Sequence, residues 1–405
     1  MSTGDPARAK TMAAATESVP PGRWTLARWA IASSTLGFPQ AAGPVAFALV
    51  AVALTGDASG GAAMILAMTL AQVAGAIPLT RLGRRFAMAA FLRLLVIART
   101  VALVAIAASA ASGVSLAWLI ALAAAAGLVN GAAYGYLRAV LNRIAPAAGL
   151  SRALGISATL NELTYVAAPV VASGLGSISP VLGIVAMALV GALPALLVPN
   201  LGPATAAPPE AAPRRGAGSI LRPAILLWLL CAAAGGATVA AIEIGAVALA
   251  LKFGYEPALA ILFTVPLCIA SVAGGVWVSV RNRRATRGVV VAQLLVMSAG
   301  AALAASGLSV ATTLAGAILI GLVLAPLATH YSLALDALAP PHRRPEVFAL
   351  LRTANACGVI LASALLTAVS LSTALSAITA AMVFATVAAG IASAKRREPV
   401  PPSRE

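Results

Sequence analysis

The stretch "GLVNGAAYGYLRAVLNRIAP" at residues 127–146 returns in altered form as "GLVLAPLATHYSLALDALAP" at residues 321–340, 194 residues further along the chain. A second match, at an offset of 200 residues, pairs Gly75 in "GAIPLTRLGRR" with Gly275 in "GVWVSVRNRRA". The two matches follow one another in the same order in both halves of the chain. This order predicts an internal repeat, in which each half has the same topology.

The composition around the repeat indicates a membrane protein. Of 405 residues, 61% are hydrophobic and 9% are charged, whereas ordinary soluble domains have roughly 25% charged residues. So few charged groups do not cover the surface of a soluble protein of this length. The formal net charge of +16 does not predict nucleic-acid binding, because the basic residues form short clusters between long apolar runs.

Twelve apolar runs have the length of about 20 residues that spans a bilayer. Their approximate ranges are 27–54, 59–80, 87–110, 115–141, 154–175, 178–198, 221–251, 257–280, 288–307, 310–338, 346–370 and 373–393. We therefore predict an all-α integral membrane fold with twelve transmembrane helices, arranged as two six-helix bundles with pseudo-two-fold symmetry.

The basic residues predict the orientation of these spans. Arginine clusters follow spans 2, 4, 6, 8 and 10, whereas Lys252 is the one clear basic residue in the loops of the opposite side. Since loops rich in Lys and Arg stay in the cytoplasm, both termini are predicted to be cytoplasmic. We expect a multi-pass protein of the bacterial cytoplasmic (inner) membrane, and residues 1–24 have no signal-peptide pattern.

The predicted domains follow from the same pattern. The Pro-rich segment 199–220 separates the two sets of six spans and is typical of a linker. The chain is divided into a cytoplasmic tail (1–24), an N-terminal bundle (25–198), a cytoplasmic linker (199–220), a C-terminal bundle (221–394) and a cytoplasmic tail (395–405).

The sequence has no motif of an ATP-driven pump or of an enzyme. All three lysines follow Ala or Leu, so no Gly-x-x-x-x-Gly-Lys loop is present to hold ATP phosphates. Cys231, Cys268 and Cys357 stand alone in apolar runs, without the paired spacing of a metal or disulfide site. We predict no enzymatic activity, no cofactor and no metal site, and a monomer in the bilayer whose partners are protons and a small molecule.

The loop after span 2 resembles the signature loop of the major facilitator superfamily, which has a Gly, an Asp, a basic residue, a spacer, a Gly and two basic residues. Arg81, Gly83, Arg84 and Arg85 match this pattern, Gly75 stands one place early, and Thr80 replaces the Asp. The resemblance implies a gating role for these residues.

Span 5 is similar to that of the proton-coupled antiporters of this family, because it keeps Gly155 and Pro169 of their Gly-rich motif. The resemblance covers residues from about 20 to 395 and implies two bundles that alternate in access. The basic residue that many drug exporters carry in the middle of span 4 has no counterpart, since Arg138 lies near the cytoplasmic end of its span.

Two carboxylates are predicted to lie deep in the membrane. Glu162 and Glu243 each lie about 12 Å from one end of their span, at about 1.5 Å per residue, and so near the midplane. A charge at this depth is costly and marks functional sites. Glu162 is either a protonation site or a packing residue paired with Arg352 or a backbone donor. Glu243 is either a proton carrier or the partner of a cationic substrate.

Other polar residues at similar depth complete the predicted site. His330 titrates near neutral pH and is a third candidate for proton coupling, although a hydrogen-bonded packing role is the alternative. Arg352 is expected to extend toward the membrane interface. Candidates for lining the substrate cavity, with interhelical hydrogen bonding as the alternative role, are Asn130, Tyr134, Tyr136, Asn161, Tyr165, Tyr331 and Asn355.

These features favour a secondary active transporter that exports small amphipathic or hydrophobic compounds in exchange for protons. A sugar or metabolite permease, working by uptake or facilitated diffusion, is one alternative. A membrane receptor or scaffold that transports nothing is another.

Overall fold

The computed structural model describes residues 23–56, 59–146, 149–199, 222–255, 259, 261–283 and 285–394. All regular elements in these ranges are helices. The first half contains α2 (Arg23–Thr55), α3 (Ser59–Leu82), η1 (Gly83–Arg85), α4 (Met88–Ala111), α5 (Leu116–Leu128), α6 (Asn130–Ile144), α7 (Leu150–Ile178) and α8 (Pro180–Leu197). The second half contains α9 (Pro223–Lys252), α10 (Ile261–Arg281), α11 (Arg287–Ser306), α12 (Val310–Leu338), η4 (Pro341–Arg343), α13 (Arg344–Ala368) and α14 (Leu371–Ala394).

The predicted all-helical membrane fold is confirmed. The break between α5 and α6 at Val129 lies inside the predicted fourth span, and the two helices together form one segment long enough to cross a bilayer. Among the described residues, 11 segments are long and apolar enough to span a membrane. The remaining long helix is α7, which is not among these segments and whose first half contains polar residues such as Asn161 and Glu162.

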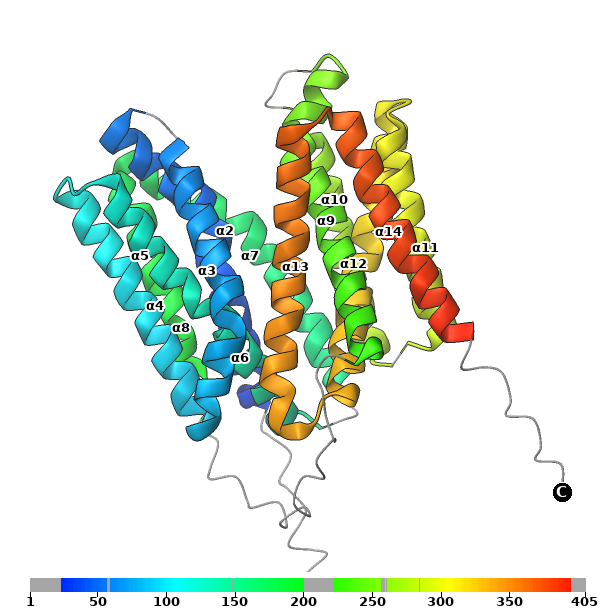
Figure 1. The fold of residues 1–405 in the computed structure, drawn as a ribbon, viewed down its shortest axis with the longest axis horizontal. Coiled ribbons are helices and arrows are strands. Elements are labelled where there is room, and N and C mark those ends of the chain that lie inside the picture. The colour runs from blue at the N-terminus through cyan, green and yellow to red at the C-terminus, as the bar shows by residue number, and fades with distance from the viewer. Residues whose placement is uncertain are drawn as a thin grey trace, which may run out of the picture.

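The helices form two groups, α2 to α8 and α9 to α14, which stand side by side in Figure 1. The groups meet mainly where α7 packs on α10, α13 on α3, α6 on α13, and α12 on α7. In the predicted repeat, α3 corresponds to α10, α6 to α12 and α7 to α13. A two-fold rotation therefore converts the α7–α10 contact into the α13–α3 contact, and the α6–α13 contact into the α12–α7 contact.

Two hydrogen bonds locate the axis of this rotation. Arg138 Nε donates to Ser332 Oγ at 2.5 Å, and Asn142 donates to Asp336, each pair being separated by 194 residues. The two residues of each pair occupy equivalent positions in the predicted repeat. Equivalent residues contact each other only near the symmetry axis, which therefore passes between α6 and α12.

Glycines allow close helix contacts at equivalent places in the two halves. A Cβ atom on Gly75 would meet the carbonyl oxygen of Leu128, and one on Gly274 would meet that of Leu322. Small residues of this kind let membrane helices approach closely. The pairing shows that Gly75 corresponds to Gly274 rather than Gly275, so the offset here is 199 residues and the sequence match at 200 was wrong by one residue. It was wrong because "GG" at 274–275 offers two glycines and only packing distinguishes them.

A larger side chain at one of these contacts is expected to destabilise the N-terminal half. A Cβ atom at position 127 would meet the backbone of Met68. Gly127→Leu therefore forces α5 away from α3 and lowers the free energy of unfolding by about 1–3 kcal/mol. We expect a lower melting temperature in detergent than for the control Gly390→Leu. Gly390 has nothing within 4 Å of its Cβ position, and both variants gain the same helix propensity. Equal melting temperatures would contradict the close contact.

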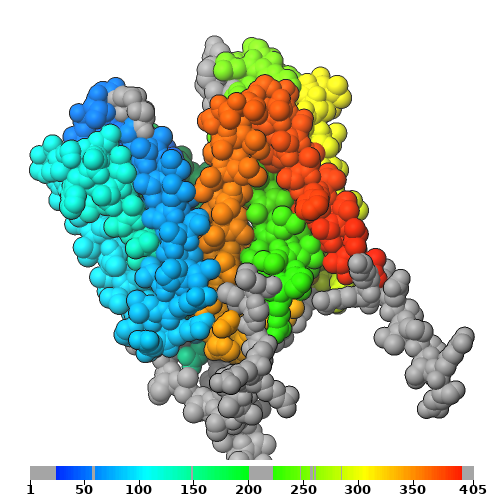
Figure 2. Space-filling model, viewed as in Figure 1, coloured from blue at the N-terminus to red at the C-terminus, as the bar shows by residue number. Residues whose placement is uncertain are grey.

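The two halves separate toward one end of the molecule. Figure 2 shows them apart at the end that carries the α13–α14 connection and in contact at the opposite end, where α3 and α4 are joined. The contact end is the one with the arginine-rich loops, which the sequence predicts to be cytoplasmic. The predicted linker and both predicted tails fall almost entirely outside the described residues, so the domain boundaries stay predictions.

Candidate functional site

Glu162 and Glu243 lie on opposite sides of the boundary between the two halves, within electrostatic range of each other. Glu162 lies on α7, next to Ser271 of α10, and Glu243 lies on α9 within electrostatic range of Glu162. Both carboxylates also act on the thiol of Cys268 on α10. The side chain of Glu162 is half-buried and that of Glu243 is exposed. The structure thus brings together the two acids that the sequence singled out.

Neither acid has a basic partner among the described residues. In the part of the chain that the structure describes, the carboxylates with a basic group within 4.0 Å are Asp336 and Glu346. The packing alternative for Glu162 named Arg352 as its counter-ion, and this pairing is not observed. Two carboxylates near each other without a counter-ion repel, and the repulsion is relieved when a proton or another cation binds. The arrangement is therefore suited to cation or proton binding.

Arg352 instead binds two tyrosines of the opposite half. Its Nη2 donates to Tyr165 Oη at 3.2 Å, and its guanidinium carbon lies 5.5 Å from the centroid of the Tyr134 ring. The hydrogen bond and the cation–π contact join α13 to α7 and α6. The expectation that Arg352 extends to the membrane interface was wrong, because the facing aromatic groups satisfy the guanidinium within the protein.

Asn161 and Asn355 occupy equivalent positions in the two halves. Asn161 Oδ1 is 3.3 Å from the Cβ position of Gly37 on α2, and Asn355 Oδ1 is 2.5 Å from that of Gly236 on α9. Both side chains are half-buried. Each asparagine thus lies against a glycine of the first helix of its own half, where it fixes the packing of a helix that borders the central cleft.

Asn130 belongs to a polar network inside the N-terminal half. Arg99 on α4 donates to Asn130 Oδ1 at 3.0 Å and to carbonyl oxygens of α2 and α8 at 2.8 and 2.7 Å. Asn130 in turn donates to Gln72 at 2.6 Å and to the half-buried Gln40 at 3.5 Å. Arg99 is 3% exposed. It supplies, from span 3, a buried positive charge next to the middle of span 4.

His330, Tyr331 and Tyr136 lie apart from the acid pair. His330 and Tyr331 pack against Trp228, with ring centroids at 4.9 and 6.0 Å. Trp228 lies near the start of α9, whereas Glu243 lies near its other end, so about 22 Å of helix separates the two levels at about 1.5 Å per residue. Tyr136 is buried under the signature loop and donates to the Thr80 carbonyl at 2.8 Å. The roles predicted for these three residues stay predictions.

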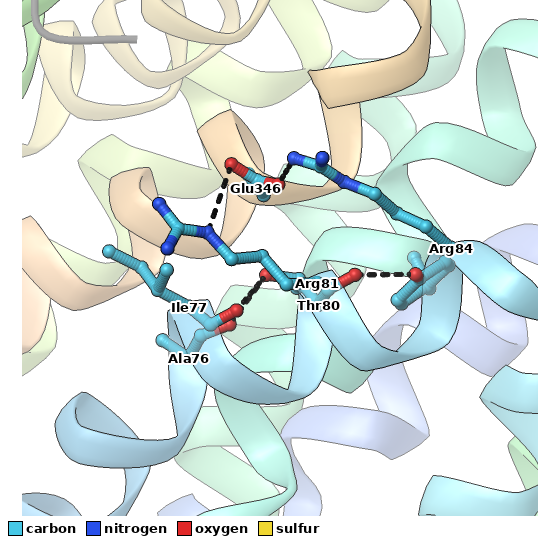
Figure 3. Close-up of polar contacts among 7 residues, drawn as sticks. Ala76, Ile77, Thr80, Arg81, Arg84 and Glu346 are labelled. Carbon is cyan, nitrogen blue, oxygen red and sulfur yellow. Dashed lines mark hydrogen bonds and ion pairs between the residues drawn. The ribbon is translucent and has the colours of Figure 1, made fainter.

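The signature loop closes on an acid of the other half, as Figure 3 shows. Glu346, in the first turn of α13, is 1% exposed and pairs with Arg84, and its carboxylate lies 3.9 Å from Arg81 Nε. The side-chain hydroxyl of Thr80, which replaces the Asp of the family pattern, donates to the Ala76 and Ile77 carbonyls, at 2.8 and 2.9 Å. The carboxylate that faces the arginines of the loop is thus on α13. Sequence reasoning missed Glu346 because it considered only acids deep within spans.

Two further parts of the loop explain its residue types. A Cβ on Gly83 would meet the Phe91 ring and the Tyr136 hydroxyl, so the loop passes too close to α4 and α6 for a larger residue. Arg85 is exposed on the loop. Its predicted gating role stays a prediction.

A second polar layer closes the same end near the symmetry axis. The guanidinium carbon of Arg138 lies 4.5 Å from the centroid of the Phe348 ring, and Arg344 Nε lies 3.1 Å from Asp336 Oδ1. Together with the Arg138–Ser332 and Asn142–Asp336 contacts, this layer closes the contact end of the interface, which carries the arginine-rich loops and is called the basic end below. The acid pair lies on the open side.

The comparisons with known proteins agree with this architecture. The profile of the Major Facilitator Superfamily matches residues 29–363. No curated protein sequence matches the chain. Among solved structures, a bacterial homologue of the iron transporter ferroportin in the outward-facing state is 17% identical, with a TM-score of 0.73 over 92% of this chain and 98% of that chain.

Two other solved structures are similar at lower identity. The E. coli fucose:proton symporter FucP has a TM-score of 0.70 at 14% identity, over 91% of this chain and 99% of that one. The human organic anion transporter MFSD10 has a TM-score of 0.65 at 13% identity, over 90% and 97% of the two chains. At these identities the likeness concerns the fold alone.

Proposed function

Because the chain belongs to the major facilitator superfamily, we propose that this membrane transporter works by alternating access and exports small amphipathic compounds in exchange for protons. The observation that carries the proposal is that Glu162 and Glu243, on opposite halves, lie within electrostatic range of each other, and neither has a basic residue of the described structure within 4.0 Å. A substrate site at the repeat interface near the bilayer midplane is the arrangement expected for secondary transporters.

The acid pair supports a cationic substrate. When both carboxylates are ionised, their mutual repulsion is relieved by an amphipathic cation with its charge between them and its apolar part against the surrounding helices. Protons compete for the same oxygens, so proton uptake from the open side displaces the cation. This competition couples the two flows, because each carboxylate binds a proton or the substrate, and not both.

The closed end of the interface supports the direction. With the arginine-rich loops in the cytoplasm, the cleft seen here opens to the outside. A proton gradient directed inward then favours protonation of the pair in this state, which releases the cation outward. The protonated carrier is the form that returns to open inward, where the higher pH restores both charges.

A thermal-stability experiment tests the substrate class. We use purified protein at pH 6 and pH 8 with tetraphenylphosphonium, an uncharged amphiphile of similar size, and a neutral sugar. Ligand binding to the folded state raises the melting temperature by mass action. We expect tetraphenylphosphonium to raise it more at pH 8 than at pH 6, because protons compete less at the higher pH.

Two outcomes would contradict the proposal. Stabilisation by the sugar alone favours a permease. The absence of any stabilisation across a wider set of amphipathic cations, by a protein that elutes as a single folded species, favours a receptor or scaffold.

Transport in proteoliposomes with an imposed pH gradient tests the direction. An exporter moves the stabilising compound against the direction of proton flow, and an uptake permease moves it with the protons or without need of them.

A further inference from the structure

A cavity of about 440 Å³ lies between α10, α11 and α12, and neither Glu162 nor Glu243 is among its lining residues. Both α10 and α11 pack against α12, so α12 forms the floor of a groove and the other two helices form its walls. The lining residues are Leu322 and Pro326 on the floor, Ala273, Gly274 and Trp277 on one wall, and Gln293 on the other.

The groove opens toward the bilayer. On α10, Gly275 and Ser279 face α7, since Cβ atoms of Gly155 and Gly275 would meet Ser279 and Thr159 respectively. Trp277 lies two residues after Gly275 and thus points about 200° away around the helix. Its side chain is 46% exposed, as is expected for a residue in contact with lipid.

One end of the groove is strongly basic. The guanidinium carbon of Arg281 lies 5.2 Å from the centroid of the Trp277 ring, and thus at the rim of the groove. Arg283 and Arg287, in the short connection from α10 to α11 and at the start of α11, are also exposed. Within the described residues, none of the three has a carboxylate within 4.0 Å. This group of positive charges therefore lacks counter-ions within the part of the chain that the structure describes.

The wall of the groove carries one unsatisfied polar group. Gln293 Oε1 is buried and has no hydrogen-bond partner among the described residues. Gln293 lies about 9 Å above Arg287 along α11, at about 1.5 Å per residue. Gln293 therefore lies deeper in the groove than the arginines at its rim.

We infer that the groove binds one anionic phospholipid of the leaflet at the basic end. The phosphate lies between Arg281 and Arg287, an acyl chain lies on Leu322 and Pro326, and Trp277 packs along the chain. Basic pockets between membrane helices on this side of the bilayer are suited to acidic lipid headgroups. The acid pair and the exchange of protons have no part in this site.

Native mass spectrometry of the full-length purified protein tests the inference. The probes are dioleoyl-phosphatidylglycerol and dioleoyl-phosphatidylcholine, which share their chains and differ in net charge. We expect the first bound lipid to be phosphatidylglycerol, with an affinity at least about tenfold higher than that of phosphatidylcholine. Arg281→Gln combined with Arg287→Gln should remove this preference. The control is Arg143→Gln, which removes an exposed arginine in the last turn of α6, at the same end of the molecule, and it should keep the preference.

A second variant tests the groove itself. Ala273 is exposed within the wall, so Ala273→Phe fills the cavity without disturbing the contact of Gly274 with Leu322. We expect this variant to lose the tightly bound lipid while its melting temperature in lipid-free detergent is unchanged. Equal binding of both lipids to the wild type would overturn the inference, and so would full retention of phosphatidylglycerol by Ala273→Phe. Binding of free glycerol phosphate as tightly as the lipid would assign the site to a soluble anion instead.

Discussion

Glu243→Gln is expected to reduce gradient-driven transport in proteoliposomes by about 100-fold or more, to the level of leakage. Glutamine keeps the shape of the side chain but takes up no proton and carries no charge. A charge-assisted contact contributes about 1.5–3 kcal/mol, which is about a ten- to hundredfold change in affinity for a cation, and the loss of the titrating group removes the coupling in addition. Glu162→Gln is expected to have the same effect, because both carboxylates act on one proton or cation.

The controls separate coupling from folding. Glu243→Asp keeps a titrating group and should retain measurable gradient-driven transport. The melting temperature of each glutamine variant should equal or exceed that of the wild type, because a like-charge repulsion without a counter-ion is removed. The double variant should be no worse than either single one, since residues that act as a unit are not additive. Full gradient-driven transport by both single variants would remove the pair from the mechanism.

The sequence was sufficient for the helices and their grouping, because those signals are local or repeated. A run of about 20 apolar residues predicts a span from length alone, and the matched stretches 127–146 and 321–340 predict that the halves are alike. The break at Val129 is not marked by Gly or Pro at that position, so it was not predicted. The register of Gly75 against Gly274 needed the packing of both halves before it could be assigned.

The site was only partly predictable, because its main contacts join residues far apart in the chain. Glu346 is separated from Arg81 by more than 260 residues, and no local pattern pairs them. Arg352 was placed at the interface because its tyrosine partners lie on the other half. Arg99 was a different omission. A charged residue in the middle of span 3 is visible in the sequence, and the rule that flags such residues applies to bases as well as to acids.

Glu346→Gln is expected to shift the equilibrium between the two access states by about ten- to hundredfold toward the state open at the basic end. In the structure, Glu346 is buried and pairs with Arg84 across the two halves, with Arg81 nearby. Hydrogen bonds to charged groups contribute about 1.5–3 kcal/mol, and each 1.4 kcal/mol is about a factor of ten in an equilibrium. The pair exists only while the halves meet at this end, so its loss penalises only that state.

Double electron–electron resonance measures the separation of the halves at this end. The spin labels are placed at Arg85→Cys and His342→Cys in a variant with the three native cysteines replaced by serine. Both positions are exposed. We expect the wild type to give mainly the short distance and Glu346→Gln to add a longer one. Asp336→Asn, at the less buried pair with Arg344, should shift the distribution less. The exchange Arg84→Glu with Glu346→Arg should restore part of the short-distance population, because it keeps one attraction across the two halves while Arg81 then faces a like charge. A distribution unchanged by Glu346→Gln would mean that the helix contacts between α3, α6 and α13 hold the closed end without this ion pair.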